Sequence, residues 1–187
     1  MYIGLKDKWV DLGICDAILT SKSYIKPDPP LIAALISFWS TTSNTFIFSE
    51  GFLSPTLLDV SAMLSLPIKG VSIHHDMNCK EHDKIDIDRT NSALGYTRFL
   101  NKYKHNFDEV ITFEEKTCFY LYWLCKFLIN SSSKRIVTYY LPIAIALANR
   151  HKLALGHFFL GFVYRTLFLA TTQPKESIGG PLWFIQL

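Results

Sequence analysis

The sequence predicts a mainly α-helical fold, a single multi-helix domain with a small β-hairpin near residues 45–54. Apolar residues recur at helical spacing along most of the chain, and short strand-like segments are confined to the region of the hairpin. The composition predicts a packed core, because 49% of the residues are hydrophobic and 19% are charged, with 14 Phe, 9 Tyr and 4 Trp. Disordered chains lack such an aromatic content. At 187 residues we expect one unit of seven or eight helices over 1–187.

The N-terminal part of the chain predicts two helices joined by a proline-rich connector. Apolar residues follow a helical stripe over 8–19, which predicts one helix there. Pro29 and Pro30 favour the first turn of a second helix, over 31–39, because a first-turn residue needs no backbone N–H donor. The residues expected to face inward on this second helix are Leu31, Leu35, Ile36 and Trp39.

A hairpin and a capped helix follow. Residues 46–48 and 52–54 are strand candidates on either side of a Ser49-Glu50-Gly51 turn. Thr56 is a natural N-cap, and Asp59, three residues later, is placed as in a capping box. The carboxylate also favours the positive end of the helix dipole. A helix is therefore expected to begin at residue 57.

Pro67 and Gly70 end this helix, which predicts a span of 57–66. A threonine-capped helix followed by a turn also opens helix-turn-helix motifs, and such a motif requires a recognition helix after Gly70. Residues 71–73 have the pattern of a strand or loop instead. We therefore expect a structural helix here, with DNA recognition as the alternative.

The polar stretch 74–89 predicts a surface loop. It holds a group of potential Zn²⁺ ligands whose spacing matches no common zinc pattern. The metal site stays an alternative to a solvated loop, and the loop is the expectation. The residues concerned are His74, His75, Cys79 and His82.

The C-terminal half predicts four helices. The first follows Thr90, with an apolar pattern formed by Leu94, Phe99, Leu100 and Tyr103. Thr112 caps a long helix over 113–129, and two more are expected over 134–149 and 153–170. The last is 18 residues of mostly apolar sequence, which raises the alternative of a membrane span. It contains His157 and Arg165, and because an arginine inside a bilayer is costly, we expect a core helix and no membrane partner.

The formal charge of +3 is too small to imply a polyanionic partner, but its distribution is uneven. Residues 101–187 carry 10 basic and 5 acidic side chains. A basic face of this kind can meet phosphates, whereas an ordinary solvated rim also explains it, since there is no dense basic run. The residues nominated for nucleic-acid contact are Lys134, Arg135, Arg150 and Lys152.

The cysteines, Cys15, Cys79, Cys118 and Cys125, form no CxxC pair. The last two are seven residues apart on one helix, about 10.5 Å, which is too far for a disulfide. We expect them to be buried thiols, and a nucleophile pair with His157 is the alternative. Reduced thiols suit the nucleus or the cytoplasm. We expect Arg165 either to extend its charged end to solvent or to pair with a carboxylate such as Asp59.

The stretch from Phe38 to Gly70 resembles the plant mobile domain family. That family shows a Trp, an Asn-Thr-Phe strand and a Thr-Leu-x-Asp-Val-x-x-x-Leu-x-Leu-Pro-x-x-Gly helix. Weaker matches follow in the expected order at Leu141-Pro142 and at 155–157, where Leu155 replaces a usual Trp, and at 178–180. The motif residues are Trp39, Asn44, Thr45, Phe46, Thr56, Leu57, Asp59, Val60, Leu64, Leu66, Pro67, Gly70, Gly156, Gly179 and Gly180.

The resemblance implies a transposon-related plant protein, similar to nuclear factors in transposon silencing, genome integrity and meristem maintenance. It also implies a protein partner, which in some members is a serine/threonine phosphatase. It implies no catalytic residues and no cofactor. Members are often labelled aminotransferase-like, but a pyridoxal-phosphate enzyme needs a Schiff-base lysine and a phosphate cradle, and Gly179-Gly180 alone is not one.

We therefore expect a non-enzymatic interaction domain in the nucleus, with the cytoplasm as the alternative location. A nucleic-acid-binding module is the alternative function, and an enzyme with an unrecognised site is a third hypothesis. The chain ends on the apolar run 182–185, which predicts that the domain continues past Leu187.

Overall fold

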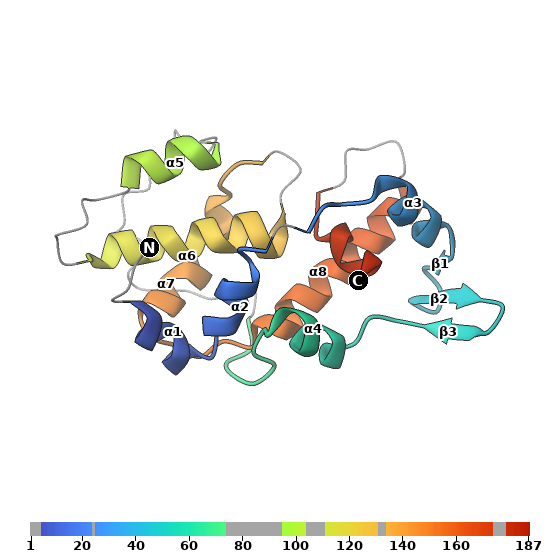
Figure 1. The fold of residues 1–187 in the computed structure, drawn as a ribbon, viewed down its shortest axis with the longest axis horizontal. Helices are drawn as coiled ribbons and strands as arrows, with labels where there is room; N and C mark the ends of the chain where they lie inside the picture. Colours follow the sequence, from blue (N-terminus) through green and yellow to red (C-terminus); the bar gives the residue numbers. More distant parts are fainter. Residues whose placement is uncertain (1–4, 24, 74–94, 104–110, 131–133, 174–178) are drawn as a thin grey trace.

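The computed structural model describes residues 5–23, 25–73, 95–103, 111–130, 134–173 and 179–187. These residues form eight α-helices and a three-stranded antiparallel sheet, so the predicted mainly α fold is confirmed (Figure 1). The elements are α1 (Lys6–Leu12), α2 (Cys15–Thr20), α3 (Pro29–Ser37), β1 (Trp39–Ser40), β2 (Thr45–Phe48), β3 (Gly51–Leu53), α4 (Leu57–Leu64), α5 (Tyr96–Tyr103), α6 (Phe113–Trp123), α7 (Leu141–Ala148) and α8 (Leu155–Thr172). A π-helical segment (Leu124–Ile129) and two 3₁₀ turns (Thr138–Tyr140 and Leu182–Gln186) complete them.

The single helix predicted over 8–19 is wrong, because the chain forms two helices there. Gly13 has a left-handed φ of 70° and closes α1, and α2 begins at Cys15. A residue in this conformation cannot continue a right-handed helix, and glycine adopts it without a Cβ clash. The break lets Trp9 stack on Phe119 of α6, with ring centroids 5.4 Å apart.

Helix α3 has prolines in its first turn as predicted, but it spans Pro29–Ser37 instead of 31–39 and buries fewer side chains than predicted. Asp28 is its N-cap and accepts a hydrogen bond from the Leu31 N–H at 3.1 Å, with prolines in the first turn. Leu31 is 43% exposed, so its predicted inward position is wrong. Leu35 and Ile36 are half-buried against the core. The helix lies at the periphery of the fold, where it packs on α8 and the C-terminal 3₁₀ turn, so only one side of it is covered.

Trp39 is buried, but it belongs to a strand that the sequence did not reveal. The predicted hairpin is confirmed as β2 and β3, and β1 adds to it in the order β1-β2-β3. Trp39 lies opposite Phe46, and Phe46 in turn lies opposite Leu53. Paired residues in neighbouring strands share a face of the sheet, so Trp39 and Phe46 are presented together to the helices.

Helix α4 begins with the predicted capping box. The Thr56 side chain accepts a hydrogen bond from the Asp59 N–H at 3.2 Å, and the Asp59 carboxylate accepts one from the Thr56 N–H at 2.8 Å. The helix ends at Leu64 and not at residue 66, because Ser65 takes a left-handed φ of 53°. The start of α4 was therefore predictable to the residue, and its end was not.

We expect Thr56→Ala to lower the free energy of unfolding by about 1 kcal/mol at pH 7. Hydrogen bonds from Thr56 lower the pKa of the Asp59 carboxyl below 3.8, so this stabilisation is present above that pH. It is lost as the pH falls through the lower folded-state pKa. Urea unfolding of both proteins at pH 7 and at stepwise lower pH measures the difference. A difference that grows on acidification would contradict the assignment.

The buried side chains form one cluster, in which α6 packs on α7, and α8 packs on α4, α3 and the π-helical segment. The predicted helix over 113–129 is confirmed as one continuous rod, capped by Thr112, whose last turns widen into the π-helical segment. The helix predicted over 134–149 is wrong in its first half: Lys134 has a left-handed φ of 50°, and α7 begins only at Leu141. Pro142 occupies the first turn of α7, since proline fits only where no N–H donor is required.

Helix α8 lies two residues later than the predicted 153–170. It runs through the right-hand part of the molecule, with α4 on one side and α3 and the C-terminal turn on another (Figure 1). No helix in the described ranges is long and apolar enough to cross a membrane.

Candidate interaction surface

Three motif residues hold the loop after α4 against the start of α8. The Val71 N–H donates to the Lys152 carbonyl at 2.7 Å, and the Gly156 N–H donates to the Pro67 carbonyl at 2.9 Å. Gly70 has a φ of +143°, and a Cβ added to it would lie 2.6 Å from the Lys152 carbonyl oxygen. Gly70 and Gly156 are therefore needed for a close backbone approach, to which Pro67 contributes its carbonyl.

Another motif group joins the sheet to α8. Trp39 is buried and meets Phe46 and Tyr164 edge-on, with ring centroids 4.9 and 5.5 Å away. The Tyr164 hydroxyl donates a hydrogen bond to the Pro55 carbonyl at 2.9 Å. The sheet is thereby fixed to the helical body through aromatic contacts on one of its faces.

The glycine pair near the C-terminus packs on the same helix. The Gly180 N–H donates to the Asn130 carbonyl at 2.9 Å, and a Cβ on Gly180 would overlap the buried Thr166 side chain of α8. Gly179 precedes it and is half-buried, whereas the third member of that motif, Ile178, lies outside the described residues.

The remaining motif residues also hold the fold together. Val60, Leu64 and Leu66 are buried, Leu57 is half-buried, and Thr45 contacts Ser43 through a 2.7 Å hydroxyl hydrogen bond. In the part of the chain that the structure describes, the motif residues thus form a framework around α4 and α8.

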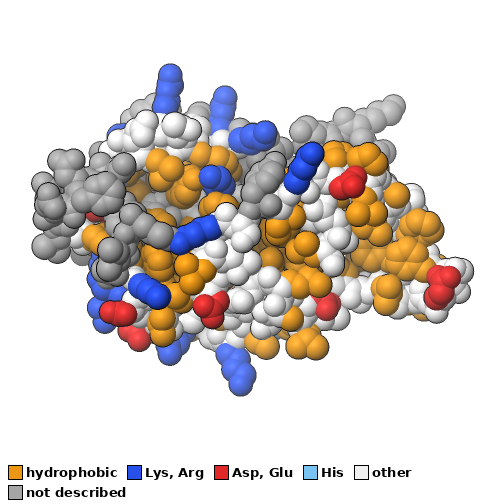
Figure 2. Space-filling model, viewed as in Figure 1, with side chains coloured by type: hydrophobic (Ala, Val, Ile, Leu, Met, Phe, Trp, Pro, Cys, Tyr) orange, Lys and Arg blue, Asp and Glu red, His pale blue; other side chains and the backbone are white. Residues whose placement is uncertain are grey.

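Exposed apolar side chains also lie beside this framework, on the hairpin and on α4. Phe52 is 70% exposed and Leu58 is 74% exposed. Figure 2 shows hydrophobic side chains over the sheet at the right-hand end and below α4. We call this the sheet–α4 surface, and it consists of Ile47, Phe52, Leu53, Leu58 and Met63.

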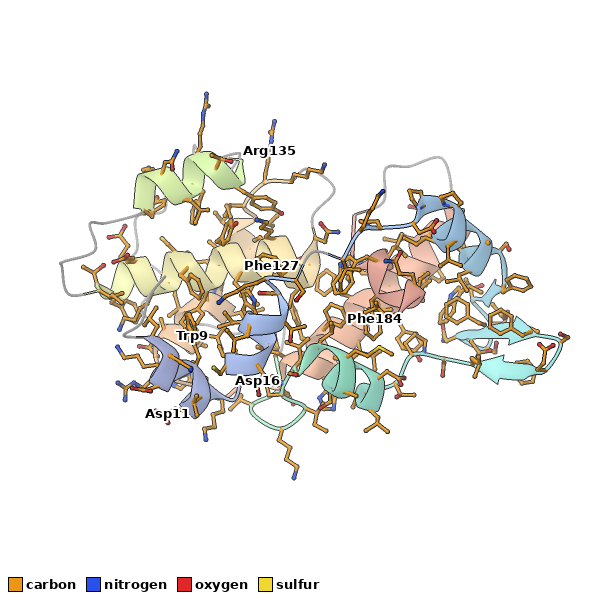
Figure 3. All side chains as sticks on the ribbon, viewed as in Figure 1. Trp9, Asp11, Asp16, Phe127, Arg135 and Phe184 are labelled. Carbon is orange, nitrogen blue, oxygen red and sulfur yellow. The ribbon has the colours of Figure 1, made fainter. Side chains whose placement is uncertain are left out.

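The four nominated basic residues are all exposed but come from two connections. Lys134 and Arg135 precede α7, where Arg135 forms a β-bridge with Gly95 at the start of α5. Figure 3 shows Arg135 at the edge of the molecule on the α5 side. Arg150 and Lys152 follow α7. The four residues therefore lie at opposite ends of α7 and do not make one patch.

A different basic group comes from three elements. Burial lowers the pKa of the Lys116 ammonium on α6, and the charges of Lys8 on α1 and Arg150 after α7 lower it further. We call Lys8, Lys116 and Arg150 the Lys116 cluster. Only Arg150 was nominated from the sequence, because nothing local to Lys8 and Lys116, far apart in the chain, signals that they meet.

The two helical cysteines are core residues, as expected. Cys118 and Cys125 are buried, and burial raises the pKa of their thiols to about 12 and about 11. The Cys125 sulfur accepts a hydrogen bond from the Val137 N–H at 3.4 Å. His157 is exposed on α8, so the structure does not support the alternative of a Cys–His nucleophile pair.

We expect Cys118 and Cys125 to resist iodoacetamide at pH 8 in the native protein and to react in denaturant. The thiolate is the reacting form, and both burial and the raised pKa suppress it. Peptide mapping by mass spectrometry after timed alkylation checks this. Rapid native-state alkylation of either cysteine would contradict the assignment.

The structure also tests the expected Arg165–Asp59 ion pair and the helix-turn-helix alternative. The suggested Arg165–Asp59 ion pair is wrong, because the Asp59 carboxylate accepts hydrogen bonds from Thr56 at the start of α4. Arg165 is exposed, which agrees with the alternative that its charged end reaches solvent. The residues directly after Gly70 form a parallel bridge between Val71 and Leu153 and begin no recognition helix.

The group His74, His75, Cys79 and His82 lies outside the described residues, as does the loop predicted over 74–89. Among the residues that are described, no group of three or more His, Cys, Asp or Glu side chains could hold a metal ion.

Comparison with known proteins identifies the family of this chain. The sequence signature of the plant mobile domain matches residues 13–187. The chain belongs to the plant mobile domain family. The predicted resemblance is thus confirmed over most of the chain.

Two Arabidopsis thaliana proteins contain a region similar to this plant mobile domain. Protein MAIN-LIKE 2 is 31% identical over 175 residues, which cover 87% of this chain and 26% of that protein. Serine/threonine-protein phosphatase 7 long form homolog is 26% identical over 206 residues, which cover 99% of this chain and 15% of that protein. The chain therefore spans about a quarter or less of the relatives it matches. No solved structure matches it.

Proposed function

We propose that this plant mobile domain is a non-enzymatic protein-docking domain of a transposon-related nuclear protein. The observation that carries the proposal is the sheet–α4 surface. Phe52 and Leu58 are mostly exposed, although the same elements are fixed to α8 by Trp39 and Tyr164. Exposed apolar side chains on elements that are themselves held in place favour a protein interaction site.

The partner that we propose is a serine/threonine phosphatase, and the process is transposon silencing linked to genome integrity and meristem maintenance. Two observations support this. The chain is similar to Protein MAIN-LIKE 2, and a similar region occurs in a protein named as a phosphatase 7 long form homolog.

The buried Cys118 and Cys125, with pKa values raised to about 12 and about 11, are unsuited to nucleophilic catalysis and fit the non-enzymatic role.

Biolayer interferometry with a purified plant serine/threonine phosphatase tests the docking function. The variant Phe52→Ser/Leu58→Ser removes two exposed side chains of the sheet–α4 surface and is expected to weaken binding at least about tenfold. The matched control Lys134→Ser/Arg135→Ser changes two exposed residues before α7 and is expected to bind as the wild type does. Equal binding of both variants, or no binding by the wild type, would refute the proposal.

A nucleic-acid-binding function is the second candidate, and the Lys116 cluster favours it. Lys8, Lys116 and Arg150 bring positive charge together from three elements. Fluorescence anisotropy with labelled duplex and single-stranded DNA at two salt concentrations tests it, because phosphate contacts make affinity fall steeply with salt. Salt-sensitive binding that Arg150→Ala weakens would support this candidate over the first. Absence of binding at low salt would exclude it.

A further inference from the structure

Strand β3 is an edge strand with one free side. The sheet has the order β1-β2-β3, so β3 pairs only with β2 among the described elements. Figure 1 shows the β2–β3 hairpin projecting from the helical body at the right-hand end, with β3 on its outer side. The outer edge of β3 therefore faces away from the rest of the described structure.

The backbone pattern shows which peptide groups lie on that edge. The Ile47 N–H donates to the Phe38 carbonyl at 2.9 Å, so the peptide groups of Ile47 point toward β1. Because successive residues of a strand point their N–H and C=O groups to opposite sides, Phe46 and Phe48 point toward β3. They pair with Leu53 and Gly51.

By the same alternation, the N–H and C=O of Phe52 point outward, to the free edge of β3. One donor and one acceptor are thus offered in the geometry of a sheet ladder. Phe52, which lies opposite Ile47, is at the centre of this edge.

The side chains of this edge do not protect it. Natural edge strands are often blocked by a charge, a proline or a bulge, or are kept very short, as β3 is. Strand β3 has the sequence Gly-Phe-Leu, and all three residues are exposed. Phe52 lies with Ile47 on one face of the sheet, and Leu53 lies on the other face, so apolar side chains flank the free peptide groups on both sides.

We propose that β3 binds an extended peptide segment of a partner protein, which adds to the sheet as a fourth strand. The inference rests on the proposed docking function and specifies the chemistry of the partner. The segment exchanges two backbone hydrogen bonds with Phe52, and its alternating apolar side chains pack on Phe52 on one face and on Leu53 on the other.

A flexible segment fits this edge better than a second copy of the same chain does. A stable dimer buries about 800 Å² on each partner, and self-pairing of a three-residue strand covers little more than Phe52 and its neighbours. An extended peptide needs no second rigid surface, and it can continue past Leu53 toward the exposed Leu58 on α4.

The test begins with a phage-displayed library of random 12-residue peptides selected on the wild-type chain. A selected peptide is synthesised and titrated against the wild type, Phe52→Ala and Phe52→Pro. Both variants lose the aromatic ring, but only proline removes the outward N–H, and an edge strand tolerates proline where no ladder bond is lost. We expect Phe52→Pro to bind at least about tenfold more weakly than Phe52→Ala.

A second measurement needs no variant. Peptide addition to the wild type is expected to protect the Phe52 amide from hydrogen exchange by NMR, while the Phe46 and Phe48 amides report that the β2–β3 ladder is intact. Equal binding by Phe52→Pro and Phe52→Ala, an unprotected Phe52 amide, or a library that yields no binder would overturn strand addition.

The two proposals fail in different ways. A peptide that binds away from β3 overturns strand addition and leaves protein docking standing. Phosphatase binding that is insensitive to Phe52→Ser/Leu58→Ser overturns the proposed function, whatever the peptide titrations show.

Discussion

Gly70→Ala is expected to lower the free energy of unfolding by at least about 3 kcal/mol, the largest effect of any glycine substitution tested below. Gly70 has a φ of +143°, which side chains rarely adopt, and its missing Cβ leaves room for backbone atoms of Lys152, Leu153 and Ala154 within 2.9 Å of the Cβ position. Backbone cannot move aside as a flexible side chain can. The substitution therefore separates the loop after α4 from the start of α8.

Two other glycines separate the cost of the unusual backbone φ from the cost of the close backbone approach. Gly51 has almost the same φ, +142°, but nothing lies within 4 Å of its Cβ position, so Gly51→Ala measures conformational strain alone, about 1–2 kcal/mol. Gly95 has neither feature, and Gly95→Ala is expected to change stability by about 0.5 kcal/mol or less. Urea unfolding followed by circular dichroism measures all three. A Gly70→Ala cost equal to that of Gly51→Ala would show that the close approach carries no energy.

Trp39→Ala is expected to lower the free energy of unfolding by about 3–5 kcal/mol. The side chain is buried between Phe46 of the sheet and Tyr164 of α8, and its loss leaves a cavity at the only aromatic junction seen between these described elements. Because this junction fixes the sheet, the variant is also expected to lose binding through the sheet–α4 surface before it unfolds globally. Denaturant unfolding and the phosphatase titration measure the two effects.

Trp39→Phe is the matched control. The indole N–H of Trp39 is buried and has no hydrogen-bond partner in the described structure, so its removal costs no hydrogen bond. The corresponding change at Trp123 removes a donor that bonds to the Ser21 hydroxyl at 3.2 Å. Trp39→Phe is therefore expected to destabilise less than Trp123→Phe. The reverse order would contradict the assignment of Trp39 as a purely apolar contact.

Several starts of elements could be predicted because their causes lie within four residues. Thr56 and Asp59 satisfy each other's backbone N–H at the start of α4, and the Thr112 side chain accepts a hydrogen bond from the Glu115 N–H at the start of α6. The prolines at 29 and 30 open α3 for an equally local reason. The family motif is also formed by residues close together in the chain, so the resemblance to the family could be recognised without the structure.

The predictions that were wrong or missed depend instead on contacts between residues that are far apart in the chain. The helix expected over 134–149 begins only at Leu141, and the expected Arg165–Asp59 pair does not form, because these outcomes depend on what packs nearby. Strand β1 was missed since two residues carry no periodicity of their own. The Lys116 cluster was missed because Lys8, Lys116 and Arg150 meet only after α1, α6 and α7 have packed.

The mainly α class, the hairpin, the helix caps and the family follow from the sequence alone, because caps, turns and apolar periods depend on residues close together in the chain. The structural roles of the motif residues and the position of the candidate site depend on tertiary contacts. Gly70 and Trp39 are explained by atoms of Lys152 and Tyr164, more than eighty residues away in the chain. Whether Phe52 is core or surface likewise depends on which face of the sheet the helices cover, and no local pattern encodes that choice.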